Sequence, residues 1–325
     1  MQDEKVMDIK QPAEKQMRIE RKKHKIKAIE KSLPLHLMVL VPMYFIILFN
    51  FGSMFGLIMA FQDYMPGQGW FVFGSKFVGF ENFTRLFNDP LIWQILKNTV
   101  VIALMKIVFG TLFPILVAIL LNEVGISGIK RGVQTLIFLP YFISWVILAG
   151  VFTKLFSTDG GILNTMFLKI GITLPDFLGD PKHFPTLLVV SDIWKGAGDS
   201  VIIFLAAITN IDPNLYEAAK IDGAGYVRQC FAVTLPGMMS VIVLMTILNM
   251  GNILNAGFEQ VYNLYSDMVY STGDILDTFI YRTAFEGAMD YSLSTAATLF
   301  KSAVSFIFVA VTYIIAYKKF DYKVF

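Results

Sequence analysis

Six long apolar segments constrain what this chain can fold into. Their approximate bounds are 35–61, 95–121, 133–156, 184–209, 234–256 and 296–317. A helix needs about 20 apolar residues to cross the roughly 30 Å hydrocarbon core of a bilayer, and every segment reaches that length. Charged residues make up only 16% of the chain, against about 25% in soluble domains. The sequence therefore predicts an all-α integral membrane protein with six transmembrane helices.

The N-terminal region does not have the pattern of a cleaved signal peptide. Its basic stretch is long, and the first apolar run of about 27 residues exceeds the apolar core of a signal. We therefore expect three parts: a basic tail at 1–33, a membrane domain at 34–317 and a C-terminal tail at 318–325. With Cys230 as the single cysteine, an intramolecular disulfide is excluded.

Lysine and arginine are distributed unevenly between the segments that connect the apolar runs. One set of segments carries 17 of them: 1–33, 122–132, 210–232 and 318–325. The alternate set carries five: 62–91, 157–183 and 257–295. Because cytoplasmic connections are enriched in Lys and Arg, both termini and the 210–232 segment are predicted to lie in the cytoplasm. The basic tail adjoins a span, which favours contact with anionic lipid over nucleic-acid binding.

The 257–295 segment, on the predicted outer side, is acidic. It holds six carboxylates and one basic residue, Arg282. Such a composition is typical of a solvated loop, and it equally suits a docking surface for an extracytoplasmic partner. Composition leaves both interpretations open.

The stretch "EAAKIDGAGYVRQCFAVTLP", residues 217–236, interrupts the apolar pattern between the fourth and fifth segments. Before it, Asp212 is a good N-cap and Pro213 occupies the first helical position. Gly223 favours the left-handed conformation that commonly ends a helix. The pattern predicts two short helices outside the bilayer, over 213–222 and 226–233, in a coupling loop at 210–236 that we call the 210–236 hairpin.

One face of the first of these helices has a distinctive composition. The residues that share it are Leu215, Ala218, Ala219 and Asp222. The two alanines permit close approach of another surface. Periodicity alone leaves open whether the hairpin is a connector or a functional element.

Residues 217–236 also resemble the signature of permease subunits of type I ABC importers. That signature is Glu-Ala-Ala, three residues, Gly, nine residues, an aliphatic residue, one more residue, and Leu-Pro. Its positions are filled by Glu217, Ala218, Ala219, Gly223, Val233, Leu235 and Pro236. Seven matched positions in the appropriate loop make this a specific resemblance.

Further stretches resemble the carbohydrate-importer branch of that family. They are "GLIMAFQDYMP", "FVGFENF", "DIWKGAG", "AGFEQVYNLY" and "LDTFIYRTAF". They are similar to the polysaccharide-permease type related to the maltose permease MalF, the LplB-like group. The similarity runs from about residue 34 to the C-terminus, and it implies the type I importer permease fold with six spans.

The resemblance implies a division of labour between subunits. In that family the matched loop is the coupling helix, which enters a cleft of a cytoplasmic ATPase and transmits its closure. Coupling is thereby assigned to Glu217, Ala218, Ala219, Asp222, Gly223, Leu235 and Pro236. The sequence has no G-x-x-x-x-G-K-[ST] phosphate loop, so we expect no enzymatic activity and no cofactor in this chain.

The resemblance implies that this chain lies in the bacterial cytoplasmic membrane as one subunit of a larger complex. ATP and Mg²⁺ are expected on two separate ATPase subunits. A second, related permease would complete a heterodimeric pore, and an extracytoplasmic solute-binding protein would deliver the substrate. That substrate is expected to be an oligosaccharide or a polysaccharide fragment, moved by alternating access.

Ionisable groups in the fourth apolar segment are costly in hydrocarbon and usually mark a pathway or a partner. Asp192, Lys195 and Asp199 share one helical face at i, i+3 and i+7. Asp192 and Lys195 could form a neutralising ion pair or contribute to a sugar pathway. Trp194 is a candidate for stacking on a sugar ring. In the same segment, Gly196 and Gly198 could let the helix unwind or approach another helix closely.

The fifth segment carries Asn249, Asn252 and Asn255 at steps of three, followed by "GFEQ", which contains Glu259. Amides between membrane helices often hold those helices together, so structure and substrate contact are both open. We include Asn249, Asn252 and Glu259 among the candidate pathway residues. Lys106, in the second segment, is expected to face a partner helix or a cavity. Lys301 lies near the end of its segment, and we expect it to reach outward.

Short patterns in the sequence also bear on two functions from other classes. "GAGD" at 196–199 matches a Gly-x-Gly-Asp pattern of intramembrane aspartyl proteases, but those enzymes need a second carboxylate on a neighbouring helix. Asp192 lies on the same helix, about 10 Å further along at 1.5 Å per residue, which disfavours a protease. An ion-coupled secondary transporter is the alternative kept, although the sequence shows no convincing internal repeat.

Overall fold

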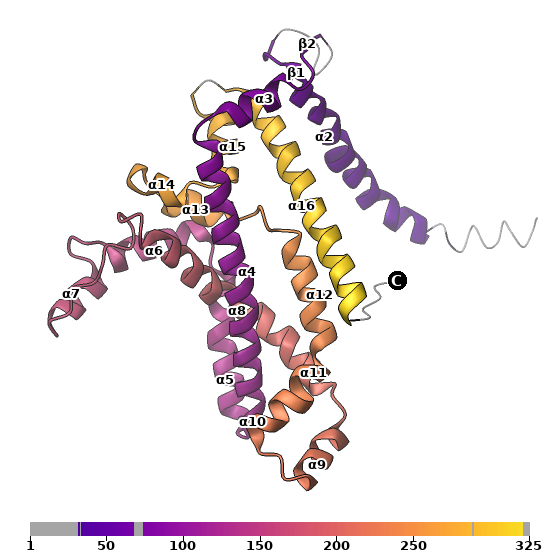
Figure 1. Cartoon of the computed structure of the whole chain (residues 1–325), viewed down its shortest axis with the longest axis vertical. Coiled ribbons are helices and arrows are strands. Elements are labelled where there is room, and N and C mark those ends of the chain that lie inside the picture. The colour runs from indigo at the N-terminus through magenta and orange to yellow at the C-terminus, as the bar shows by residue number, and fades with distance from the viewer. Residues whose placement is uncertain (1–31, 33, 68–73, 288, 321–325) are drawn as a thin grey trace, which may run out of the picture. The chain divides into compact units, whose positions relative to one another are not determined.

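The structure is a computed structural model that describes residues 32, 34–67, 74–287 and 289–320 (Figure 1). It divides into two units, Met1–Ile58 and Met59–Phe325, each described by itself. In the first unit, residues 34–46 are α-helical, and the helix continues through a π-helical turn, η1 (Ile47–Phe51), and α2 (Gly52–Met54). A 3₁₀ segment, η2 (Phe55–Phe61), leads into the second unit. Apart from Ser32, the basic tail 1–33 lies outside the described residues.

The first half of the second unit contains one small sheet and two long helices. Strand β1 (Gln62–Asp63) pairs antiparallel with β2 (Lys76–Phe77). The helices that follow are α3 (Glu81–Asn88), α4 (Ile92–Glu123), α5 (Ser127–Phe138), η3 (Leu139–Phe142), α6 (Trp145–Phe156), α7 (Ile162–Leu168) and α8 (Phe184–Thr209). The second apolar segment, predicted at 95–121, lies within α4, and the predicted 184–209 segment coincides with α8.

The second half begins with the 210–236 hairpin and ends with a third long helix. Its elements are α9 (Pro213–Ile221), α10 (Tyr226–Gln229), η4 (Cys230–Thr234), α11 (Leu235–Gly237), α12 (Met239–Met250), α13 (Phe258–Leu264), η5 (Asp267–Val269), α14 (Tyr270–Gly273), α15 (Leu276–Phe285) and α16 (Tyr291–Phe320). Figure 1 shows α10 beside one end of α4 and α9 beyond that end, with α3 and α15 at its other end.

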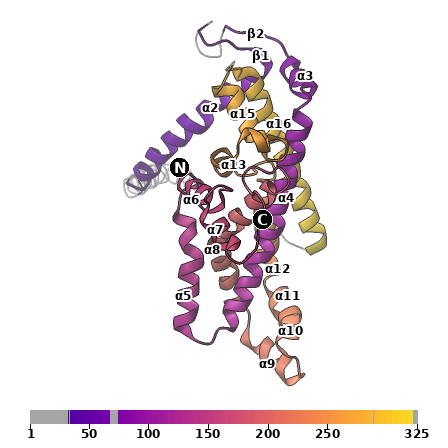
Figure 2. The ribbon, with the colours of Figure 1, turned by 90° about the vertical axis from the view of Figure 1, so that its left-hand side faces the viewer.

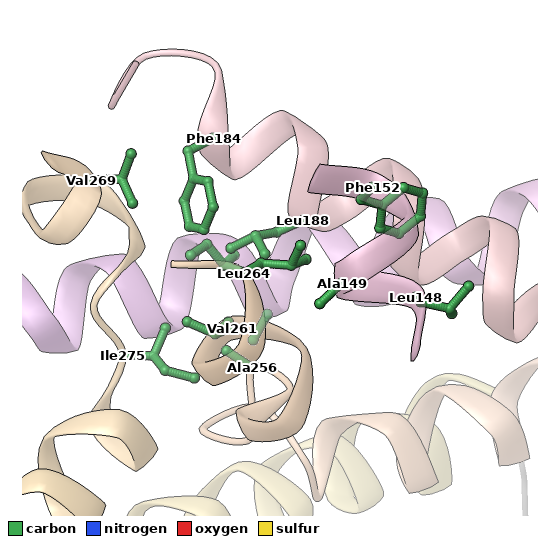
Figure 3. Close-up of a cluster of buried hydrophobic side chains, with 12 residues drawn as sticks. Leu148, Ala149, Phe152, Phe184, Leu188, Ala256, Val261, Leu264, Val269 and Ile275 are labelled. Atoms are coloured by element: carbon green, nitrogen blue, oxygen red, sulfur yellow. The ribbon is translucent and has the colours of Figure 1, made fainter. Parts of the chain in front are cut away.

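The core of the second unit is built on α4 and α8, which pack along one another. Toward the hairpin end, Ala118 of α4 and Phe204 of α8 belong to one buried cluster. A second cluster brings Leu148, Phe184 and Val261 together, and Figure 3 shows α6, α8 and α13 meeting there. α13 is thereby fixed against the helices that carry the intramembrane charges.

Three helices within the described ranges are long and apolar enough to cross a membrane: Pro34–Phe61, Ile92–Glu123 and Tyr291–Lys318. Two bent helix pairs raise this number to five if each pair is one span. α8 has 26 residues, but Asp192, Lys195 and Asp199 lower its apolar character. The described residues thus contain three to five candidate spans, against the six expected from the sequence, and α8 is long enough but more polar.

The predicted span at 133–156 is one of the broken segments. Its helix begins earlier, at Ser127, so that Lys130 and Arg131 lie on α5 rather than in a loop. The chain then bends by 103° between Phe142 and Trp145. Ser144 explains the break, because its hydroxyl accepts a hydrogen bond from the Ile147 N–H and starts α6 as an N-cap. Hydropathy alone does not predict such a cap, so the apolar run predicts one continuous helix.

The predicted span at 234–256 is the second broken segment. Tyr226–Gly237 and Met239–Met250 meet at a 60° bend, and the helix ends at Met250. Pro236 contributes to the irregularity, because it has no N–H and its ring crowds the preceding turn. A wider π-helical turn, η4, directly precedes it. The second hairpin helix therefore runs from Tyr226 to Gly237 instead of ending at 233.

The described residues of the acidic 257–295 segment form a series of helices, so the segment is not an irregular loop. It forms α13, η5, α14, α15 and the start of α16. Half of its carboxylates are paired with a cation: Asp274 with Arg282, Asp277 with Lys301, and Asp290 with Arg85. Lys301 thus contacts Asp277 on α15 rather than simply reaching outward.

Candidate functional site

A cavity of about 220 Å³ lies between α4, α8 and α12. Its lining combines apolar residues with six polar side chains, those of Lys106, Asp192, Ser200, Asn249, Asn252 and Asn255. Gly196 and Gly257 also line it. Three predicted candidates, Asp192, Asn249 and Asn252, are therefore brought together from different helices. The expectation that Lys106 faces a cavity is confirmed.

Lys106 is nearly buried and is held by three acceptors. Its ammonium group donates to the backbone oxygen of Ala256 at 2.7 Å and to Oε1 of Gln260, and its Nζ lies 3.4 Å from Oδ1 of Asp192. The Lys106 side chain is 9% exposed, whereas that of Asp192 is 37% exposed. Asp192 therefore presents carboxylate surface to the cavity while Lys106 balances its charge from behind.

This arrangement corrects the expected Asp192–Lys195 ion pair. The Lys195 ammonium group instead donates to the backbone oxygen of Tyr141 at 2.9 Å and lies over the rings of Tyr141 and Trp145. Positions three residues apart on one helix can be neighbours. Here the two side chains point to different elements, because Asp192 pairs with Lys106 of α4 and Lys195 donates to the Tyr141 oxygen of η3.

Gln260 is a residue that sequence reasoning missed. Its side chain is fully buried, and its Nε2 donates to the backbone oxygen of Leu188 and to Oγ of Ser191, both at 2.8 Å. Its Oε1 accepts from Lys106. The sequence around "GFEQ" did indicate that Gln260 is buried, because Gln260 and the apolar Leu264 are four residues apart and lie on one helical face.

Gly257 allows the Lys106 ammonium group to approach the backbone closely. Gly257 has φ = +92°, and a Cβ there would lie 2.8 Å from Lys106 Nζ. Another residue would therefore meet both a left-handed backbone and the ammonium group. The Gly257 conformation, the Ala256 carbonyl and Gln260 together fix the position of Lys106.

The remaining predicted pathway residues lie apart from the lining of this cavity. Trp194 is exposed and packs edge-on against Phe152. Glu259 is exposed on α13, one turn before Asn263, whose amide donates to the Glu259 backbone oxygen. Of the two glycines expected to open or pack α8, Gly198 packs closely: a Cβ there would lie 2.6 Å from the Cα of Phe138.

The 210–236 hairpin has the predicted caps. Oδ1 of Asp212 accepts a hydrogen bond from the Asn214 N–H at 3.0 Å, and Pro213 occupies the first turn. Gly223 has φ = +73°. The N–H of Ala224 donates to the Ala219 oxygen, and that of Gly223 to the Lys220 oxygen, which is the Schellman pattern of a helix C-terminus. The helix ends at Ile221, and Asp222 is its C-cap rather than its last residue.

The hairpin exposes apolar side chains. They are Leu215, Ile221, Tyr226, Val227 and Phe231. On the predicted face of α9, Leu215, Ala218 and Asp222 are exposed and Ala219 is half-buried. The Tyr216 hydroxyl lies 3.0 Å from Oγ1 of Thr234 and ties α9 to the second helix. The hairpin is thus a stiff projection with an apolar surface.

A helical membrane bundle with an interior polar cavity and a projecting capped hairpin has the features of a transport subunit. Residues 110–320 match the family described as the binding-protein-dependent transport system inner membrane component. The chain belongs to this family.

Individual relatives of known name support this family membership. The chain is 43% identical over 289 residues to the polygalacturonan/rhamnogalacturonan transport system permease protein YteP of Bacillus subtilis (strain 168), covering 89% of each chain. It is 37% identical over 295 residues to Protein LplB of the same strain, covering 90% of this chain and 91% of LplB. The predicted resemblance to sugar ABC importer permeases is confirmed.

Solved structures give the same fold. A chain of a bacterial alginate ABC transporter, in complex with an alginate pentasaccharide-bound periplasmic protein, superposes with a TM-score of 0.82 at 34% identity. The match covers 92% of this chain and 99% of that chain. The fold is therefore that of an ABC importer permease, a membrane subunit, and the ion-coupled alternative receives no support from these relatives.

Proposed function

We propose that this chain carries oligosaccharide or polysaccharide fragments across the cytoplasmic membrane through the cavity between α4, α8 and α12. The observation that carries the proposal is the lining, where one carboxylate and three carboxamides converge within the membrane-spanning bundle. Carboxylates and amides match the donors and acceptors of sugar hydroxyl groups. The named cargo of two relatives, polygalacturonan and alginate, supports a polysaccharide fragment.

The residues at the cavity divide into two roles. Asp192, Asn249, Asn252 and Asn255 would contact sugar hydroxyl groups. Lys106 would orient the Asp192 carboxylate through their ion pair without itself leaving its acceptors. Trp194, Lys195 and Glu259 would act around this site, by packing or by contact with the cargo outside it.

The membrane arrangement that we propose has six spans. They are the three long helices, α8 and the two bent pairs, with both termini and the 210–236 hairpin in the cytoplasm. The distribution of Lys and Arg supports this orientation. Segments α3 and α13–α15 would then face the outside, where a solute-binding protein docks.

Transport would follow an alternating-access cycle driven by partner subunits. This chain and a second, related permease would form the pathway, and two ATPases would bind ATP and Mg²⁺. ATP-driven closure would move the hairpin and open the pair toward the docked binding protein. Hydrolysis would return it to the inward state. No nucleotide chemistry is assigned to this chain.

Uptake into vesicles tests the function. The permease pair, the ATPases and the binding protein are reconstituted, and labelled oligogalacturonides are added outside with ATP inside. We expect uptake that requires both ATP and the binding protein. Uptake driven by an ion gradient without ATP would contradict the proposal and restore the secondary transporter.

The hairpin offers a test of coupling with a matched glycine control. Gly223 needs a left-handed backbone, so Gly223→Ala costs roughly 1–2 kcal/mol locally, and Gly223→Val adds bulk at the same place. Gly225 has φ = −69°, so Gly225→Ala tests an ordinary position nearby. We expect Gly223→Val and Glu217→Ala to insert normally but to lose ATPase retention or substrate-stimulated ATP hydrolysis, with Gly225→Ala unaffected. Wild-type transport by both hairpin variants would reduce the hairpin to a connector.

A further inference from the structure

Aromatic rings form a connected series in the part of the second unit opposite the hairpin. We call the following six residues the aromatic row: Phe258, Tyr262, Tyr281, Phe285, Tyr291 and Tyr64. Successive ring centroids lie 5.3, 4.9, 5.2, 6.5 and 6.2 Å apart. These rings come from α13, α15, the first turn of α16 and the segment after β1. All of them except Tyr291 lie in the stretches that are similar to carbohydrate importers, but those stretches alone give the rings no role.

The aromatic row begins beside the cavity. Asn255 and Gly257 belong to the cavity lining, and Phe258 is the first residue of α13. From there the row follows α13 and α15 to Tyr291 and Tyr64. The backbone N–H of Tyr64 donates to Oγ of Ser292 at 2.8 Å, which fixes the far end of the row on α16. Figure 2 shows α13, α15 and the β1–β2 pair in succession away from the α9 end.

The rings remain partly accessible. Phe285 is exposed, and the other five members of the row are half-buried. The row is also amphipathic, because four of its six members are tyrosines. The Tyr262 hydroxyl donates to Oε1 of Glu286 at 3.5 Å. A hydrogen bond with Tyr281 raises the pKa of the Tyr262 hydroxyl, so that this group stays protonated and able to donate.

We propose that the aromatic row is a binding track for a pyranose chain at the outer mouth of the pathway. This inference rests on the proposed function, because it takes a sugar polymer as the cargo. The apolar C–H face of a pyranose ring stacks on an aromatic ring, and the tyrosine hydroxyls and Glu286 meet its hydroxyl groups. Stacking depends little on sugar identity or register, so a chain can advance from one ring to the next.

Aromatic residues also gather at membrane interfaces, where they contact lipid headgroups. A second aromatic cluster separates this role from the track. Phe61, Phe80 and Phe83 contact one another, and Phe80 is exposed. Phe83 lies on α3, Phe80 is its N-cap and Phe61 ends η2, so none of these rings is on α13 or α15. Phe80→Ala therefore removes an exposed ring that the track does not use.

The test compares uptake of long and short oligogalacturonides in the reconstituted complex. Tyr262→Leu removes an aromatic face but keeps apolar volume, and Tyr262→Phe keeps the face. We expect Tyr262→Leu and Tyr281→Leu to lower uptake of long chains by about tenfold, equal to about 1.4 kcal/mol, and uptake of dimers much less. Phe80→Ala should transport long chains as the wild type does, and Tyr262→Phe, which keeps the ring and loses only the hydroxyl, should retain more long-chain uptake than Tyr262→Leu. ATP hydrolysis measured with the binding protein but without sugar should be unchanged in Phe80→Ala.

Several outcomes would overturn the track. They are equal uptake of long chains by wild type and Tyr262→Leu, an equal loss for long and short sugars, and a similar loss in Phe80→Ala. The complex with Tyr262→Leu could also fail to assemble. If Tyr262→Phe and Tyr262→Met then both restored assembly, the role of the ring would be packing. Failure of the wild type to take up any sugar would instead count against the proposed function.

Discussion

The ammonium group of Lys106 lies 3.4 Å from the carboxylate of Asp192, so an ion pair joins α4 to α8 beside the cavity. The two partners are 86 positions apart in the chain. Asp192 is the more exposed partner and borders the cavity, whereas Lys106 is nearly enclosed. The pair therefore links the packing of two central helices to the polarity of the cavity.

Double-mutant analysis should show coupling between these two residues. Lys106→Met removes the charge and leaves the acceptors Ala256 and Gln260 unpaired, and Asp192→Asn removes the counter-charge. We expect each single variant to lower the thermal midpoint of the purified complex. The loss of stability in the double variant should be smaller than the sum of the two single losses by about 0.5–3 kcal/mol. Lys195→Met is the matched control, and its effect should add to that of Asp192→Asn within about 0.5 kcal/mol. Coupling to Lys195 instead would contradict the ion pair described.

Replacing Gln260 should destabilise the protein more than replacing a neighbour on the same helix. Gln260→Leu leaves the Leu188 oxygen, the Ser191 hydroxyl and Lys106 each with one partner fewer. A buried polar group left unpaired costs about 1–3 kcal/mol. Asn263→Leu changes an exposed amide on α13 and should have little effect. Equal thermal midpoints for the two variants would show that the Gln260 network does not stabilise the bundle.

Two glycines of α8 should respond in opposite directions to alanine. A Cβ at Gly198 would lie 2.6 Å from the Cα of Phe138, so Gly198→Ala must push α5 away; overpacking of this kind costs about 1–3 kcal/mol. Nothing lies within 4 Å of a Cβ at Gly196. Gly196→Ala should be neutral or stabilising, because alanine favours a helix by up to about 1 kcal/mol over glycine. The comparison is made by thermal unfolding in detergent, and an equal response of both variants would contradict the close contact with Phe138.

Accessibility of single cysteines tests the proposed orientation. In a variant lacking Cys230, cysteines at Ser127 and Lys220 should be shielded from an impermeant thiol reagent in intact cells. Cysteines at Asp159 and Asp267 should be labelled. All four positions are exposed, whereas Asp274 is buried against Arg282 and would be a poor probe. The reverse pattern of labelling would invert the topology and place the hairpin outside.

Local sequence rules predicted the elements that depend on neighbouring residues. Asp212 and Gly223 begin and end the first hairpin helix as expected, because a cap is a contact between residues a few positions apart. The extent of α8 was also predictable from its apolar composition. The bend at Ser144 was not, because that side chain acts on the backbone in a way that hydropathy does not measure.

Partners across the fold could not be predicted in the same way. Helical spacing placed Asp192 and Lys195 on one face, but spacing says nothing about which helix each residue meets. Lys106 reaches Asp192 only because α4 packs along α8. Gln260 completes the network because Gly257 adopts a left-handed backbone and turns α13 toward Lys106. These contacts depend on tertiary packing, and the aromatic row depends on it in the same way.

The exposed apolar residues of the hairpin have a consequence for how much of this protein a cell can hold. A chain made without its partners presents Leu215, Ile221 and Phe231 to water, and chaperones and proteases act on surfaces of this kind. Surplus copies are therefore open to degradation until a partner covers the hairpin. We expect the abundance of this chain to follow the supply of the partner that covers it, so that stoichiometry is set after synthesis by burial of this surface.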